Sequence, residues 1–121
     1  MVAADKVTDR VTLRCDLRYV PHGVAAVFVG WPSAKMTITA DELFFDTGPL
    51  LVFARAKWSV RRECITKIEP TQHYGVRFYA TGFESPWTVA RGLFPRRFLR
   101  RLEACGIHPT GPVVRATWLK I

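Results

Sequence analysis

Arginine side chains are the groups in this sequence best suited to binding chemistry. Four of them recur in pairs near the C-terminus, at Arg96, Arg97, Arg100 and Arg101. In a helix, Arg96 and Arg100 point away from the apolar side, while Arg97 and Arg101 flank that side. Guanidinium groups bind phosphates and carboxylates through paired hydrogen bonds. The four arginines therefore predict a docking face for an anionic partner, or else a solvated face that only keeps the protein soluble.

A second basic cluster surrounds Trp58 and consists of Arg55, Lys57, Arg61 and Arg62. Cations interleaved with an aromatic residue can bind nucleic acid, with the ring of Trp58 or Tyr79 stacked on a base. Strand alternation, however, puts Trp58 on the same side as Val60 and opposite to Lys57 and Ser59. That arrangement is typical of a core tryptophan, so the cluster permits both interpretations.

Histidine, serine and cysteine side chains form no recognisable catalytic or metal-binding motif. The histidines His22, His73 and His108 fall in expected loops and have no ligand partner at metal-binding spacing. There is no Gly-x-Ser-x-Gly sequence and no phosphate-binding glycine loop. The cysteines are Cys15, Cys64 and Cys105, and their wide spacing predicts three buried free thiols. We expect no catalysis, metal or cofactor, with an enzyme site assembled from distant residues as the third alternative.

Positive charge is concentrated in the middle of the chain. The 121 residues carry 18 basic and 10 acidic side chains, a net charge of +8. Residues 1–54 hold 5 basic and 6 acidic groups, and residues 55–101 hold 11 basic and 3 acidic groups. Such a field attracts anionic lipid, nucleic acid or an acidic protein surface. The apolar run 24–31 is far shorter than the roughly 20 residues that cross a bilayer. We therefore expect a cytoplasmic protein, in solution or at the inner face of the membrane.

The first two thirds of the sequence predict β-strands. Residues 11–19 alternate apolar and polar side chains, which is typical of a half-buried strand. Residues 24–29 form a continuous apolar run, which predicts a strand buried on both faces or a short core segment, and Pro32 and Ser33 predict a break after it. Asp46–Pro49 predicts a turn. The further expected strands are 36–39, 43–45, 51–60 (one strand, or two joined by a bulge), 64–68, 75–80 and 87–89.

The period then changes to that of a helix. Phe94, Phe98, Leu102 and Cys105 recur at helical spacing, with Pro95 suited to the first turn and Gly106 to the C-terminal stop. After it, residues 112–121 form a tail that contains Trp118. We expect the tail to add an edge strand beside residues 11–19, or else to present an apolar patch to a partner.

Residues 36–45, 58–69, 75–79 and 94–107, taken together, resemble the pleckstrin-homology (PH) superfold, and most closely the small bacterial PH-like domains. The resemblance implies a mostly β (α+β) domain: a partly open barrel of about seven antiparallel strands, capped by one C-terminal amphipathic helix. Phe94, Phe98 and Leu102 would plug its open end. The domain would span residues 11–109, between an N-terminal extension (1–10) and a C-terminal tail (110–121).

The resemblance also implies binding rather than catalysis, because PH-like domains bind inositol lipids, peptides or proteins. Family members that bind inositol lipid have a basic loop between their first two strands. The corresponding loops here lack basic residues, since Asp41–Glu42 is acidic and the 21–23 turn has no Lys or Arg. We expect an adaptor that docks a protein partner through its basic face and an open sheet edge, in company with an anionic membrane surface. The alternative is a nucleic-acid-binding protein. The candidate binding residues are the two basic clusters and Trp118.

Overall fold

The computed structural model describes residues 10–20, 27–48 and 55–114. In these ranges it contains seven strands, two short 3-10 turns and a helix. The strands are β1 (Val11–Tyr19), β2 (Val27–Ile38), β3 (Glu42–Asp46), β4 (Lys57–Arg61), β5 (Ile65–Thr71), β6 (Gly75–Ala80) and β7 (Trp87–Ala90). The turns are η1 (Arg62–Cys64) and η2 (Gln72–Tyr74), and the helix is α2 (Pro95–Ala104).

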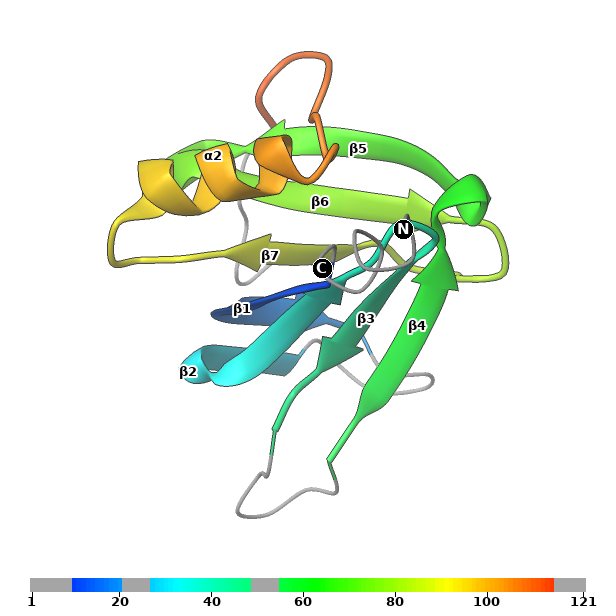
Figure 1. Ribbon diagram of the computed structural model, residues 1–121, viewed down its shortest axis with the longest axis horizontal. Coiled ribbons are helices and arrows are strands. Elements are labelled where there is room, and N and C mark those ends of the chain that lie inside the picture. The colour runs from blue at the N-terminus through cyan, green and yellow to red at the C-terminus, as the bar shows by residue number, and fades with distance from the viewer. Residues whose placement is uncertain (1–9, 21–26, 49–54, 115–121) are drawn as a thin grey trace, which may run out of the picture.

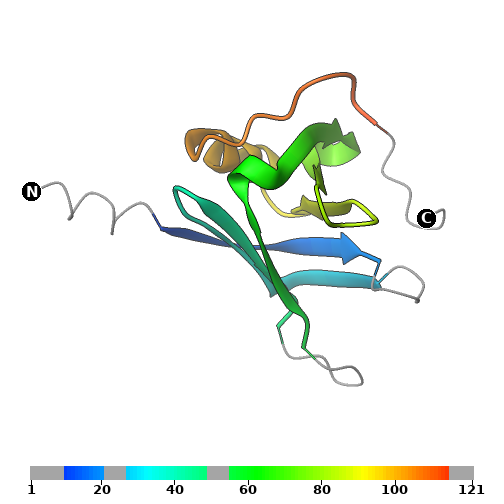
Figure 2. The same cartoon turned by 90° about the vertical axis from the view of Figure 1, so that its right-hand side faces the viewer.

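The strands form one antiparallel sheet in the order β4-β3-β2-β1-β7-β6-β5. The sheet curls through 235° into a half-barrel whose two edge strands, β4 and β5, follow one another in the chain but are not paired with each other (Figure 1; Figure 2). The predicted fold class is confirmed: a mostly β chain with a C-terminal helix of ten residues. This arrangement is compatible with a PH-like fold.

The prediction that Pro32 and Ser33 end a strand is wrong. β2 runs on from Val27 to Ile38, because both of its ends pair with β1. Val29 lies opposite Leu17 and Ala34 lies opposite Cys15, so residues 30–33 bulge outward. A bulge absorbs residues that cannot join the hydrogen-bond ladder, which is how the proline is accommodated.

The core lies inside the curl and follows the predicted alternation. Leu13, Cys15 and Leu17 of β1 are buried, and so are Met36 and Ile38 of β2. Stacked and edge-on aromatic rings fill the space between the two halves of the sheet; they belong to Phe45, Trp58, Phe78 and Trp87. Because these rings come from β3, β4, β6 and β7, the core is assembled only when the sheet is complete.

Helix α2 contributes to the core with two of the three residues expected to plug the barrel. Phe98 and Leu102 are almost fully buried. Phe94 is 57% exposed, so its assignment to the plug is wrong. The helix begins only at Pro95, and Phe94 precedes it with φ 55° and ψ 55°, a left-handed conformation that turns its side chain off the helical arc. Ile107, after the helix, is buried in the same core cluster.

The C-terminal tail follows a different strand from the one expected. Val114 forms a parallel bridge with Thr71 at the end of β5. β1 pairs with β2 on one side and, over Asp16–Arg18, with β7 on the other. The prediction that the tail pairs with residues 11–19 is therefore wrong for the part that the structure describes. Trp118 lies outside the described residues, as do residues 24–26 of the strand expected at 24–29 and residues 51–54 of the strand expected at 51–60.

Candidate functional site

The four arginines of α2 all lie on the surface, as predicted. The guanidinium of Arg96 covers the ring of Tyr74 at 5.2 Å, and its Nε donates a hydrogen bond to the Tyr74 hydroxyl at 3.0 Å. The guanidinium of Arg97 lies 5.6 Å from the centre of the Phe94 ring. Within the described ranges, Arg100 and Arg101 have no acid in salt-bridge contact. All four guanidinium groups are thus exposed, and none has an acidic partner in the part of the chain that the structure describes.

Exposed apolar side chains gather where α2 begins. Leu93 is 50% exposed, Phe94 57% and Tyr74 40%. Tyr74 arrives from η2, between β5 and β6, and Arg96 ties it to the helix. We call Tyr74, Leu93, Phe94, Arg96 and Arg97 the apolar–basic tip. Helical spacing had placed Phe94 in the core and did not select Leu93 or Tyr74, although Leu93-Phe94-Pro95 before the arginines was a visible signal.

A further arginine and aromatic pair adjoins this tip through the chain. The guanidinium of Arg91, two residues before Leu93, lies 5.2 Å from the centre of the Trp31 ring. Trp31 is 41% exposed and belongs to the β2 bulge, where its backbone N–H donates to a carboxylate oxygen of Asp16. Thus three arginines at or near the start of α2 each lie over an exposed aromatic ring: Arg91 over Trp31, Arg96 over Tyr74 and Arg97 over Phe94.

Comparisons with protein-family models, with curated proteins and with solved structures found no match to the chain.

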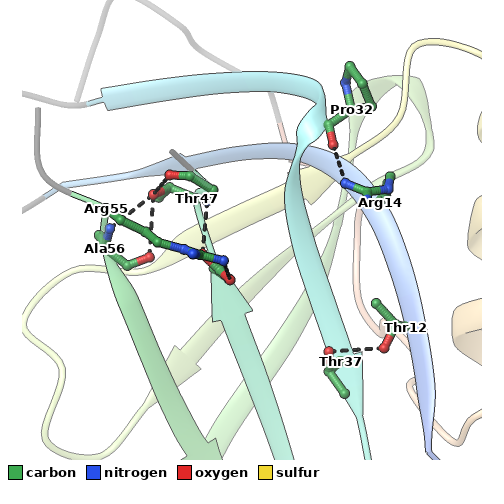
Figure 3. Close-up of polar contacts among 9 residues, drawn as sticks. Thr12, Arg14, Pro32, Thr37, Thr47, Arg55 and Ala56 are labelled. Atoms are coloured by element: carbon green, nitrogen blue, oxygen red, sulfur yellow. Dashed lines mark hydrogen bonds and ion pairs between the residues drawn. The ribbon is translucent and has the colours of Figure 1, made fainter. Parts of the chain in front are cut away.

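Two cations of the second predicted cluster, Arg55 and Arg61, are each paired with an acidic side chain. Arg55 Nε and Nη2 donate to the two carboxylate oxygens of Asp46 at 2.9 and 2.7 Å. Figure 3 shows Arg55 close to Thr47 and Ala56, where β3 ends and β4 begins. Arg61 pairs with Glu63 at 3.1 Å. Lys57 is exposed and lies beside Asp46 in the β3–β4 register, on the outer face of the sheet. The structure thus leaves this region with much of its positive charge compensated.

Arg62, the fourth cation of that cluster, holds two parts of the fold together. Its Nε donates to the carbonyl of Thr39 at 3.1 Å, and its Nη2 donates to the carbonyl of Cys105 at 2.8 Å. Cys105 is the residue that ends α2, where backbone carbonyls lack helical partners and carry partial negative charge. Arg62 therefore links the β2–β3 turn to the end of the helix.

Trp58 faces the core, as strand alternation indicated. Its ring lies 5.0 Å from that of Tyr19 and 5.6 Å from that of Phe45. Its indole nitrogen is buried and has no hydrogen-bond partner among the described residues. A ring held between two others cannot stack on a nucleic-acid base without disrupting this packing. Tyr79, the other ring considered for stacking, has the Lys67 ammonium 5.7 Å from its centre.

The Asp46–Arg55 pair makes folding sensitive to acid. The side-chain hydrogen bond from Arg55 lowers the pKa of Asp46 from 3.8 to about 2, although burial opposes this shift. Since the pKa of Asp46 is lower in the folded protein, the stabilising effect of the ion pair is complete above pH 3.8 and disappears as the pH falls through 2.

We predict that Asp46→Asn lowers the free energy of unfolding at pH 7 by about 1 kcal/mol, because an ion pair at the surface is screened by water. Urea unfolding at pH 7, 4 and 2.5 should show the difference from wild type shrinking toward the lowest pH; a constant difference contradicts this account.

Groups suited to catalysis or metal binding are scattered. Among the described residues, no three His, Cys, Asp or Glu side chains are grouped to hold a metal ion. His73 and His108 are exposed, and His22 lies outside the described residues. The cysteines in the structure are free, but only Cys15 is fully buried, so the expectation of three buried thiols is wrong for Cys64 and Cys105. Burial raises the pKa of Cys15 to about 12, so it is held as the neutral thiol.

Proposed function

We propose that this protein is a non-catalytic docking module that binds an anionic membrane surface through its apolar–basic tip and presents its sheet edge to a protein partner. The observation that carries the proposal is the exposure of Leu93 and Phe94 next to Arg96 and Arg97. No helix in the described part of the chain has the length and apolar character to cross a bilayer. In this proposal the membrane is contacted at its surface.

The chemistry of the tip suits the boundary between lipid headgroups and acyl chains. Leucine and phenylalanine side chains gain free energy on entering that boundary, and tyrosine is favoured there because its ring is apolar and its hydroxyl is polar. Arginine side chains can cover apolar surface with their stems while the guanidinium stays at the headgroups. Each cation near an anionic leaflet contributes about 1 kcal/mol, and salt weakens this attraction.

The alternative of nucleic-acid binding has less support from the geometry. Binding of single strands uses exposed rings in a basic groove, where successive bases can stack. Here Trp58, a ring considered for stacking on a base, is packed between two other rings. The exposed side chains Leu93 and Phe94 form an apolar contact surface, which favours lipid over bases.

The charge of the tip gives the test of this proposal. We predict that Arg96→Gln/Arg97→Gln lowers the affinity for phosphatidylcholine vesicles containing phosphatidylserine by roughly 30-fold, from the loss of about 1 kcal/mol per cation. Co-sedimentation across a salt series measures this effect. Binding should fall with salt, should be absent on pure phosphatidylcholine, and should persist when single-stranded or duplex DNA is added as competitor.

A charge-matched variant controls for the general loss of positive charge. Arg61→Gln/Lys67→Gln also removes two cations, both from the β4–β5 region, where each is paired with a neighbouring glutamate. Vesicle binding by this variant should stay within about threefold of wild type. Equal losses in the two double variants would show that only net charge matters, and no binding by the wild type would refute the proposal.

A further inference from the structure

The chain after α2 already occupies part of the sheet edge formed by β5. The Val114 N–H donates to the Pro70 carbonyl at 2.9 Å, and the Gln72 N–H donates to the Val114 carbonyl at 3.0 Å. Earlier in the same segment, the Thr110 N–H donates to the Ile68 carbonyl at 2.9 Å. Figures 1 and 2 both show this orange segment passing over β5. The β5 edge is therefore able to accept an extended strand, and it does so in the parallel direction.

The contact is one that a competing strand could replace. Residues 110–113 are exposed, and the Val113 side chain is 64% exposed. The described part of the segment is thus held mainly by backbone hydrogen bonds rather than by buried apolar side chains. Hydrogen bonds exchanged between water and protein stabilise a contact only weakly. Segments held in this way open locally at low free energy, well before the fold as a whole.

Space for a longer strand lies next to the occupied part of the edge. A groove of about 330 Å³ lies between the start of β5 and the chain that follows the helix. Ile65, Thr66 and Ile68 line one side, and Ile107, His108 and Thr110 line the other. The lining also includes Leu43, which belongs to the buried core. An aliphatic side chain from an incoming strand would find apolar neighbours here.

We propose that residues 110–114 are the internal occupant of a strand-binding edge on β5, and that an extended segment of a partner protein binds there in their place. This rests on the proposed docking function and names the kind of partner. We expect the partner segment to resemble the internal segment that it replaces. It should contain a proline followed by two β-branched apolar residues, as in Pro112-Val113-Val114. Its backbone donates to the carbonyls of Ile68 and Pro70 and accepts from the amide of Gln72. Pro70 has no N–H, so pairing on this edge depends on those carbonyls and that amide.

Two neighbouring proline substitutions in the full-length chain test whether the segment is held as described. Val114→Pro removes the N–H that bonds to Pro70, whereas the Val113 N–H donates to no backbone carbonyl among the described residues. Amide hydrogen exchange at Gln72 should be at least about tenfold faster in Val114→Pro than in wild type. Val113→Pro should leave it nearly unchanged. Equal exchange rates in wild type and Val114→Pro would overturn the proposal.

Binding in trans tests whether the edge accepts a partner. The probe is a synthetic peptide with the sequence of residues 108–116, titrated into isotopically labelled full-length protein. Chemical-shift changes at residues 68–72 should saturate at a concentration about tenfold lower for Val114→Pro than for wild type, whose tethered segment competes at a high effective concentration. A control peptide with proline at the position of Val114 should cause no change. If the peptide causes no chemical-shift change in Val114→Pro, the proposal is overturned. It is also overturned if the Val114→Pro protein forms dimers and does not bind the peptide.

A second variant and a second readout keep the result interpretable. Gly111 has φ 92°, and no atom lies within 4 Å of the place that a Cβ would take, so Gly111→Val disturbs the segment only through its backbone. If Val114→Pro folds poorly, Gly111→Val takes its place, and we expect from it the same response to the peptide. Vesicle binding should be unchanged in both variants, because the tip is not altered. The two proposals can therefore fail separately: peptide binding without vesicle binding, or the reverse.

Discussion

Replacing Phe98 by alanine should lower the free energy of unfolding by about 4 kcal/mol, the usual cost of removing a buried phenylalanine ring. Phe98 is 1% exposed and packs in the same cluster as Leu102 and Ile107. Removing its ring leaves a cavity between the helix and the sheet, which close-packed neighbours cannot fill without strain. Chemical denaturation with a constant m-value measures the loss.

Phe94→Ala is the matched control for that experiment. The two phenylalanines are four positions apart and share one arc of the predicted helix, so helical spacing alone assigns them equal roles. In the structure Phe94 is 57% exposed, and its ring is in contact range of the Arg97 guanidinium. The free energy of unfolding should therefore change by less than about 1 kcal/mol. Similar losses at both positions would mean that Phe94 packs in the core after all.

The largest functional effect is expected from removing the apolar part of the tip. We predict that Leu93→Ser/Phe94→Ser lowers the affinity for anionic vesicles by about 100-fold. Each side chain is about half exposed, so each would transfer part of its apolar surface to lipid, a contribution of about 1.5 kcal/mol apiece. Co-sedimentation at low and high salt checks this prediction, since the lost contribution does not depend on salt.

Salt dependence separates this variant from the arginine variant. Loss of Leu93 and Phe94 should weaken binding by the same factor at all salt concentrations, whereas loss of Arg96 and Arg97 should weaken it most at low salt. Stability should change little in the serine variant, because neither side chain belongs to the buried core. If the serine variant binds vesicles as wild type does, the membrane is held by charge alone and the apolar residues have another role.

Phe94, at the apolar–basic tip, has a left-handed backbone conformation. A bulky residue in the left-handed conformation is uncommon and costs free energy, and exposure of its ring to water offers no compensating burial. Strained residues that are not required for packing are found preferentially at binding and catalytic sites. The conformation at Phe94 is therefore consistent with selection for contact with a partner rather than for stability.

The local patterns of the sequence determined the elements and most of the faces. Period-two alternation located β1 and put Trp58 inward and Lys57 outward, because neighbouring side chains of a strand point to opposite faces whatever the strand pairs with. Helical spacing placed Phe98 and Leu102 in the core. The excess of arginine on α2 was equally visible, since a surface charge needs no tertiary partner to be recognised.

Only the tertiary structure decided which residues meet. A left-handed residue just before Pro95 moved Phe94 out of the core, and backbone conformation at a helix start is not encoded in hydrophobic periodicity. Arg62 became a link to the end of α2 because the curl of the sheet brings the β2–β3 turn near residue 105. The tail joined β5 rather than β1 because the strand order leaves β5 at an edge. Strand order depends on contacts between residues distant in sequence, which local patterns do not contain.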